Sequence, residues 1–81
     1  MAELYLDVHL ELDPIALARE PNPEKAVHEA SRAMAEEMAR GRRATLRHPL
    51  PIDVYSRPGI EKLTGKRVVL VATRWVLDGA S

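Results

Sequence analysis

The segment Lys66–Leu77 is the only stretch of the chain that would be apolar on both faces of an extended strand. Successive side chains of a strand point to opposite faces. One face would carry Val68, Leu70, Ala72 and Val76, and the other Val69, Val71, Trp75 and Leu77. A strand of this kind is typically central in its sheet and covered on both sides. We therefore predict a central strand here, with a helix over one face and a second subunit over the other.

Two earlier segments have equally clear patterns. Apolar and polar residues alternate without a fault over 4–12, which predicts a strand with one buried and one wet face. A helix is expected from Asn22, a capping residue, and Pro23, which suits a first helical position, to Gly41, a common closing residue. Its predicted buried stripe comprises Val27, Ala30, Met34 and Met38. Residues 14–20 could add one or two helical turns.

The segment between this helix and the central strand is interrupted by prolines. Alternating apolar residues over 44–54 indicate an edge strand, or two short strands with a kink, because Pro49 and Pro51 cannot donate to a sheet. Pro58-Gly59 is the expected turn into the central strand. The predicted fold is a single α+β domain, 1–81, of order β-α-β-β. It would have a three-stranded mixed sheet of order 1-3-2 and one long helix packed on one face.

Length and composition favour self-association. An 81-residue chain buries only about 60% of the surface that its unfolded form exposes, so its stability margin is small. The absence of cysteine excludes disulfides and thiolate metal sites, and it is compatible with a reducing cytoplasm. The chain has no Gln and one Asn, and Arg outnumbers Lys, as in a thermophile or a GC-rich genome. No apolar run approaches the roughly 20 residues of a membrane span, so we expect a soluble cytoplasmic protein.

The zero net charge hides an asymmetry between the two halves. Residues 1–38 hold nine acidic and three basic residues, whereas residues 39–81 hold three acidic and nine basic ones. The halves could neutralise each other within a subunit, or form patches that attract a neighbour or a polyanion. The candidate nucleic-acid contacts are Arg40, Arg42, Arg43, Arg47, Lys62, Lys66 and Arg67. The scarcity of aromatic residues for stacking argues against this alternative.

The sequence predicts no catalytic residue, no metal site and no cofactor. No serine lies in a glycine-flanked nucleophile motif, and the glycines are too scattered to cradle a phosphate. Asp7, His9 and Glu11 would share the wet face of the first strand, which is weak support for a metal. We expect an enzyme only if its site is built between subunits.

The preferred hypothesis is a small, non-enzymatic binding or assembly protein that acts as a homo-oligomer. Its interface or ligand surface would be the apolar second face of the sheet, together with the histidine that interrupts the edge-strand pattern. These residues are Val69, Val71, Trp75, Leu77 and His48. The alternatives are a nucleic-acid-associated protein that uses the basic residues, and an oligomer with a ligand site between its subunits.

Overall fold

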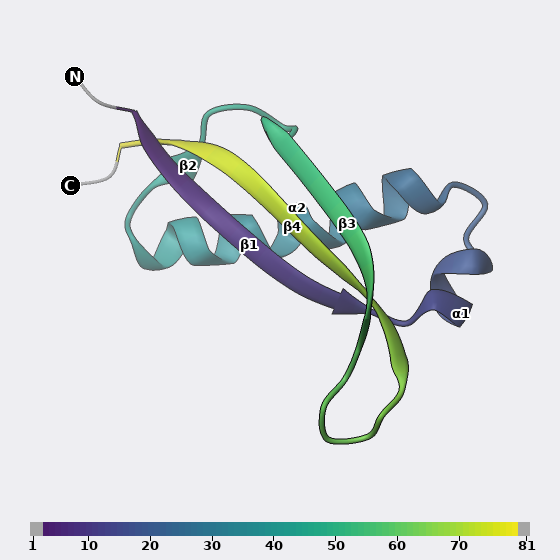
Figure 1. Ribbon diagram of the computed structural model, residues 1–81. Helices are drawn as coiled ribbons and strands as arrows, with labels where there is room; N and C mark the ends of the chain where they lie inside the picture. Colours follow the sequence, from purple (N-terminus) through teal and green to yellow (C-terminus); the bar gives the residue numbers. More distant parts are fainter. Residues whose placement is uncertain (1–2, 80–81) are drawn as a thin grey trace.

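The computed structural model describes residues 3–79 as a twisted sheet with a long helix across one face (Figure 1). Its elements are β1 (Leu4–Leu12), α1 (Pro14–Ala18), α2 (Pro23–Gly41), β2 (Thr45–Leu46), β3 (Asp53–Ile60) and β4 (Arg67–Asp78). The predicted α+β class is confirmed. The bounds of β1 are those expected from its alternation, and Asp13 caps α1 by accepting from Ile15 N at 2.9 Å.

β4 is the centre of the sheet and pairs antiparallel with every other strand. β1 lies on one side of β4, and β2 and β3 follow one another along its other side. β4 is central, as predicted, but the sheet has four strands instead of three in the order 1-3-2, and α1 is a second helix beside the predicted one. The residues 47–52, which include Pro49 and Pro51, divide the expected second strand into β2 and β3 because proline cannot donate to the ladder.

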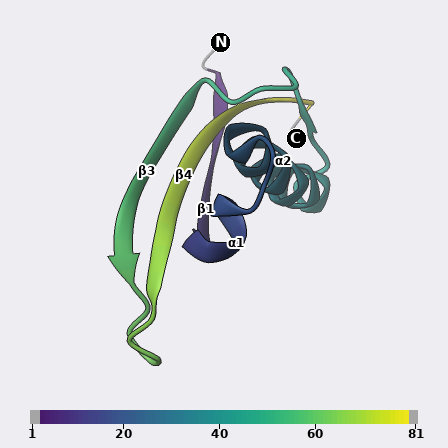
Figure 2. The same cartoon turned by 90° about the vertical axis from the view of Figure 1, so that its right-hand side faces the viewer.

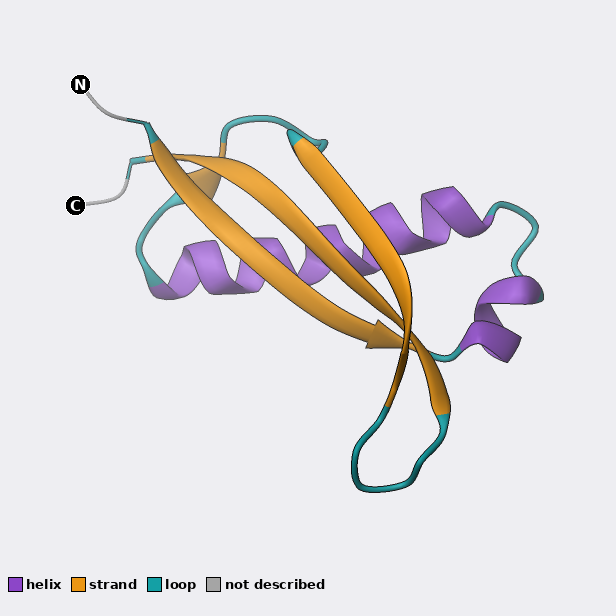
Figure 3. Ribbon diagram, in the orientation of Figure 1, coloured by secondary structure: helices purple, strands orange, loops and turns teal. Residues whose placement is uncertain are grey.

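The turn between β3 and β4 lies later than the sequence predicted. Pro58 and Gly59 are inside β3, and the chain reverses over 61–66, in a hairpin that projects beyond the rest of the sheet (Figure 3). The Glu61 carboxylate organises this turn, since it accepts from Leu63 N at 3.0 Å and from Thr64 N at 2.9 Å. The Thr64 hydroxyl also donates to it, and these hydrogen bonds lower the pKa of Glu61.

Glycine occurs at position 59 of β3 because the neighbouring strand leaves no room for a side chain. A Cβ at this position would lie 2.6 Å from Cδ1 and 2.8 Å from Cγ of Leu70 on the neighbouring strand. The Leu70 side chain therefore lies over the glycine backbone, so Gly59 permits a close cross-strand contact instead of a turn.

The buried face of α2 differs from the predicted stripe. Ser31, Ala35 and Ala39 are buried against the sheet, whereas Ala30 and Met34 are exposed. Residues spaced by four lie above one another on a helix, so the buried row is a stripe of small side chains. Small residues allow α2 to approach β1 and β4 closely, and the large Trp75 side chain from β4 fills the space beneath. Figure 2 shows α2 on the β1 and β4 side of the sheet, with β3 at the far side.

Both ends of α2 are capped, but Gly41, its last residue, does not adopt the left-handed conformation expected of a closing glycine. The Asn22 side chain accepts from Lys25 N at 3.1 Å, as expected. At the other end Ala44 N donates to Ala39 O and Arg43 N donates to Arg40 O, the two bonds of a Schellman motif. The left-handed position of that motif is occupied by Arg43, whose φ is 56°, while Gly41 is helical.

Arg43→Gly is expected to stabilise the protein by about 1 kcal/mol, because glycine adopts the left-handed conformation without the Cβ clash. Gly41→Ala should add about 0.5–1 kcal/mol, since nothing lies within 4 Å of the new methyl group. Urea unfolding at a fixed protein concentration measures both changes. Arg42→Gly is the matched control, because Arg42 has a φ of −99° and gains nothing from glycine. An equal gain in stability from Arg42→Gly would contradict the assignment of the left-handed position to Arg43.

Candidate functional site

Most residues of the predicted interface are buried within the core of a single subunit. Val71, Trp75 and Leu77 are buried, and Trp75, at 1% exposed, is at the centre of a core shared with α2 and β1. Val69 is only half-buried. α2 therefore covers Trp75 and Leu77. Val69 and Val71 line an open groove, which is described below.

A buried chain of hydrogen bonds joins α2 to β4. Trp75 Nε1 donates to Thr73 Oγ1 at 2.9 Å, and Thr73 Oγ1 is hydrogen-bonded to Ser31 Oγ. Ser31 and Thr73 are the buried polar residues of the described chain, and every buried side-chain nitrogen or oxygen there has a partner. The sequence analysis missed this contact. The feature of the sequence that could have indicated it is Thr73, a hydroxyl-bearing residue within the otherwise apolar row of β4.

The other face of the sheet, opposite α2, is crossed by ion pairs at one end. Arg74 donates to both Asp7 carboxylate oxygens, at 2.8 and 3.2 Å, and these bonds lower the pKa of Asp7. Arg47 Nη1 donates to Glu3 at 3.0 Å and its Nε donates to Asp78 at 2.8 Å. Exposed pairs of this kind contribute little to stability. They do show that this end of the face carries matched charges instead of apolar surface.

The same face has a shallow groove toward its other end. The groove has a volume of about 470 Å³, and Leu70 and Ala72 of β4 form its floor. Its polar walls come from β1 and β3: His9, Glu11, Tyr55 and Arg57. Asp7 is bound to Arg74 and does not join His9 and Glu11, and no group of three or more His, Asp or Glu side chains in residues 3–79 could hold a metal ion.

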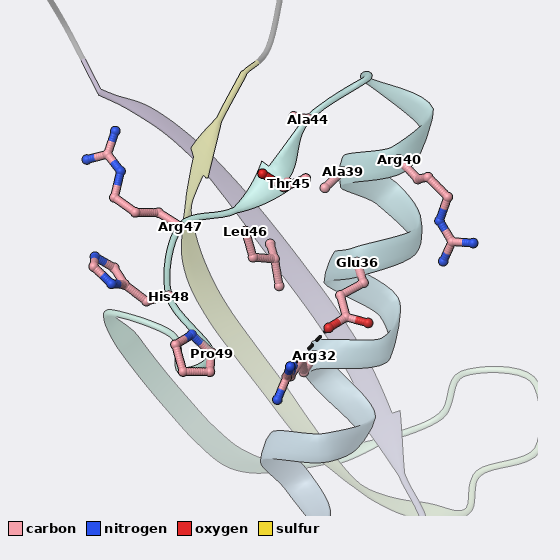
Figure 4. Close-up of a pocket in the computed structure, with 10 residues that line it drawn as sticks. All are labelled: Arg32, Glu36, Ala39, Arg40, Ala44, Thr45, Leu46, Arg47, His48 and Pro49. Carbon is pink, nitrogen blue, oxygen red and sulfur yellow. Dashed lines mark hydrogen bonds and ion pairs between the residues drawn. The ribbon is translucent and has the colours of Figure 1, made fainter.

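His48 lines a different hollow, of about 420 Å³, between α2 and the chain that follows β2. In Figure 4 the side chains of His48 and Arg47 point away from α2, while Arg40 points to the opposite side of the helix. Arg32, the remaining cation, is bound to Glu36 at 2.9 Å. The cationic side chains thus diverge, so the hollow offers no convergent anion site.

The predicted basic surface is divided between the two ends of the molecule. Arg40, Arg42 and Arg43 lie at the carboxyl end of α2, whereas Lys62, Lys66 and Arg67 lie at the hairpin tip at the opposite end (Figure 1). Arg47 is engaged with Glu3 and Asp78. The charge asymmetry of the sequence therefore does not become one basic patch.

Several exposed apolar side chains lie along β3 on the face of the sheet that α2 only partly covers. Leu50 is 59% exposed, Val54 48% and Ile60 69%. Val54 is opposite Thr73 in the ladder, and Ile60 follows at even spacing, so both point to the same face as the core. A groove of about 580 Å³ separates this surface from α2, and Leu50, Val54, Val69 and Val71 contribute to its lining. We call the exposed Leu50, Val54 and Ile60, together with Val69 and the buried Val71 at the floor of the groove, the β3 strip.

β3 is also an edge strand. Among residues 3–79 it pairs only with β4, so its outer main-chain groups have no strand partner. The sequence indicated an edge position for this region from its prolines, but it did not indicate that the strand would be long and would expose Val54 and Ile60. The reason is that Pro58-Gly59 resembles a turn.

No model of a protein family, no curated protein and no solved structure matches this chain. None of the helices in the described residues is long and apolar enough to cross a membrane. The site is therefore interpreted from its own chemistry.

Proposed function

We propose that this protein is a non-enzymatic binding or assembly protein that acts as a homo-oligomer through the β3 strip. The observation that carries the proposal is the exposure of Val54 and Ile60, on the core-facing side of β3, and of Leu50, in the segment before β3, across the groove from α2. Leu50 and Val54 line the same groove, and exposed apolar surface around a groove is typical of an interaction site. The cytoplasmic location and thermophilic source remain predictions.

The position of the strip favours a partner that docks at the β3 edge of the sheet. α2 contacts β1, β2 and β4, while β3 has its main contacts with β4 alone. An 81-residue chain with one long helix covers only part of its sheet, and a second subunit beside β3 would bury apolar surface that one subunit leaves exposed. Val69 and Val71, from the predicted interface, belong to this surface. Trp75 and Leu77 would act indirectly, by fixing α2 on the other half of the sheet.

The two alternatives have less support. The face opposite α2 carries the Asp7–Arg74 pair, and polar side chains wall its shallow groove. The basic residues are split between the ends of the molecule, so they would bind a polyanion only at two separate points. For these reasons a second candidate function is not advanced.

Val54→Asp tests the proposal. Each subunit would bring an unpaired carboxylate into the interface, so the dissociation constant should rise about 100-fold or more, as light scattering over a dilution series would show. Met34→Asp is the matched control, because Met34 is a similarly exposed apolar residue, at 41%, on the solvent side of α2. Leu50→Asp provides a second interface variant, and circular dichroism verifies that each variant is folded. An equal effect of Met34→Asp, or none of Val54→Asp, would contradict the proposal.

A further inference from the structure

We infer that two copies associate by pairing their β3 strands antiparallel, with Tyr55 opposite Tyr55 of the second copy. This inference rests on the proposed function and specifies its geometry. Pairing an exposed strand edge with a second strand satisfies main-chain groups and extends the sheet, and isologous contact about a two-fold axis is the commonest oligomer symmetry. The two sheets would become one.

The main-chain directions of β3 select the residues that can pair. Ile60 is opposite Arg67, and the next residue, Glu61, donates its N–H to Lys66 O, so the Glu61 main chain points toward β4. Main-chain groups of alternate residues point the same way. Tyr55 therefore also bonds toward β4, whereas Val54 and Ser56 direct their N–H and C=O groups outward to the free edge.

Pro58 belongs to the outward-facing set as well. Its missing N–H therefore costs nothing in the pairing with β4, which agrees with the tolerance of proline on edge strands. It does restrict a second strand, because Pro58 cannot donate to that strand. With Tyr55 on the two-fold axis, Val54 pairs with Ser56 of the second copy and each such pair exchanges two N–H···O bonds. This register places the central hydrogen bonds on residues that all have an N–H.

Charge selects the same register. Asp53 and Arg57 are exposed on the face opposite α2, two residues to either side of Tyr55. With Tyr55 on the axis, each Asp53 is opposite Arg57 of the second copy, and opposite charges across strands are stabilising. Placing Asp53 or Arg57 on the axis would put like charges together, and placing Ser56 there would set Pro58 opposite Val54.

The apolar side chains of the two copies also meet in this arrangement. Val54 is adjacent to the axis on the core-facing side, so Val54 of one copy would lie diagonally across the new strand pair from Val54 of the second copy and contact it there. β1 forms the opposite edge of the sheet, where Leu6 and Val8 are already buried under α2 and the exposed Leu4 lies at the very start of the strand. The exposed apolar residues thus single out β3 as the pairing edge.

Single cysteines test the register, because the chain has no cysteine of its own. Tyr55→Cys should form an intermolecular disulfide in glutathione redox buffer, since Cα atoms of a directly opposed non-hydrogen-bonded pair are about 4.5 Å apart and disulfides require about 4.4–6.8 Å. Asp53→Cys and Arg57→Cys should each stay reduced alone, because each residue and its copy would be about 13 Å apart along the strands. An equimolar mixture of these two variants should cross-link.

Non-reducing mass spectrometry, with the same variants in urea as the collisional baseline, distinguishes the outcomes. Cross-linking of Tyr55→Cys and of the mixture, each at least tenfold above that baseline, supports the inference. A dimeric wild type in which Tyr55→Cys cross-links no better than Asp53→Cys alone would overturn this pairing and leave the proposed function standing. A monomeric wild type, whether or not it binds another protein through the β3 strip, would overturn both.

Discussion

Replacement of Thr73 by valine is expected to destabilise the protein by about 2–4 kcal/mol, although the two side chains have nearly the same shape. The Thr73 hydroxyl accepts from Trp75 Nε1 and is hydrogen-bonded to Ser31, and all three residues are buried. Each buried polar group left without a partner costs about 1–3 kcal/mol. Urea unfolding measures the loss.

Thr45→Val is the control for this change, because Thr45 is exposed on β2 and should lose no more than about 0.5 kcal/mol. Ser31→Ala completes a double-mutant cycle. Once Thr73 is valine, removing the Ser31 hydroxyl should cost much less than it does in the wild type, since its partner is already gone. Equal costs for the two threonine variants would show that the buried hydrogen bonds do not hold α2 to the sheet.

Ala35→Leu is expected to destabilise the protein by about 3 kcal/mol, because Ala35 is fully buried between α2 and the sheet and has no room for a larger side chain. Ala30→Leu makes the same chemical change on the exposed side of the same helix and should be neutral within about 0.5 kcal/mol. Thermal and urea unfolding of the pair measure the difference. If Ala30→Leu were instead the more destabilising change, the buried face of α2 would be the predicted stripe, which includes Ala30.

The helix face shows where the sequence pattern becomes ambiguous. α2 has alanines on several sides, so apolar spacing fits more than one buried stripe, and the predicted one included Ala30 and Met34. The observed rotation depends on tertiary contacts: Trp75 needs small residues above it, and Thr73 needs Ser31. Neither requirement is visible within the helix itself.

The strands show the opposite situation. Strict alternation over β1 and the doubly apolar pattern of β4 each report burial directly, so their positions were predictable. The length of β3 was not, because Pro58-Gly59 resembles a turn until Leu70 is seen over Gly59 and Glu61 is seen to organise the reversal. As a result, the apolar surface was predicted on the central strand, whereas most of its exposed part is on the edge strand.

The divided basic residues illustrate a third limit. Arg40–Arg43 and Lys62–Arg67 resemble a single basic set in the sequence, but a helix that crosses the sheet and a projecting hairpin place them at opposite ends. Arg47 is bound to Glu3 and Asp78, which are distant in sequence. The sequence therefore shows how many cationic residues there are, but it did not predict that they lie at opposite ends of the molecule.

The solution mass of the wild-type protein tests the central claim most directly. Size-exclusion chromatography with light scattering, at several protein concentrations and at low and high salt, should give twice the subunit mass of 9.1 kDa. High salt should not dissociate the dimer, because apolar contact and main-chain hydrogen bonds are its main source of stability. A mass of one subunit at every micromolar concentration would contradict the account.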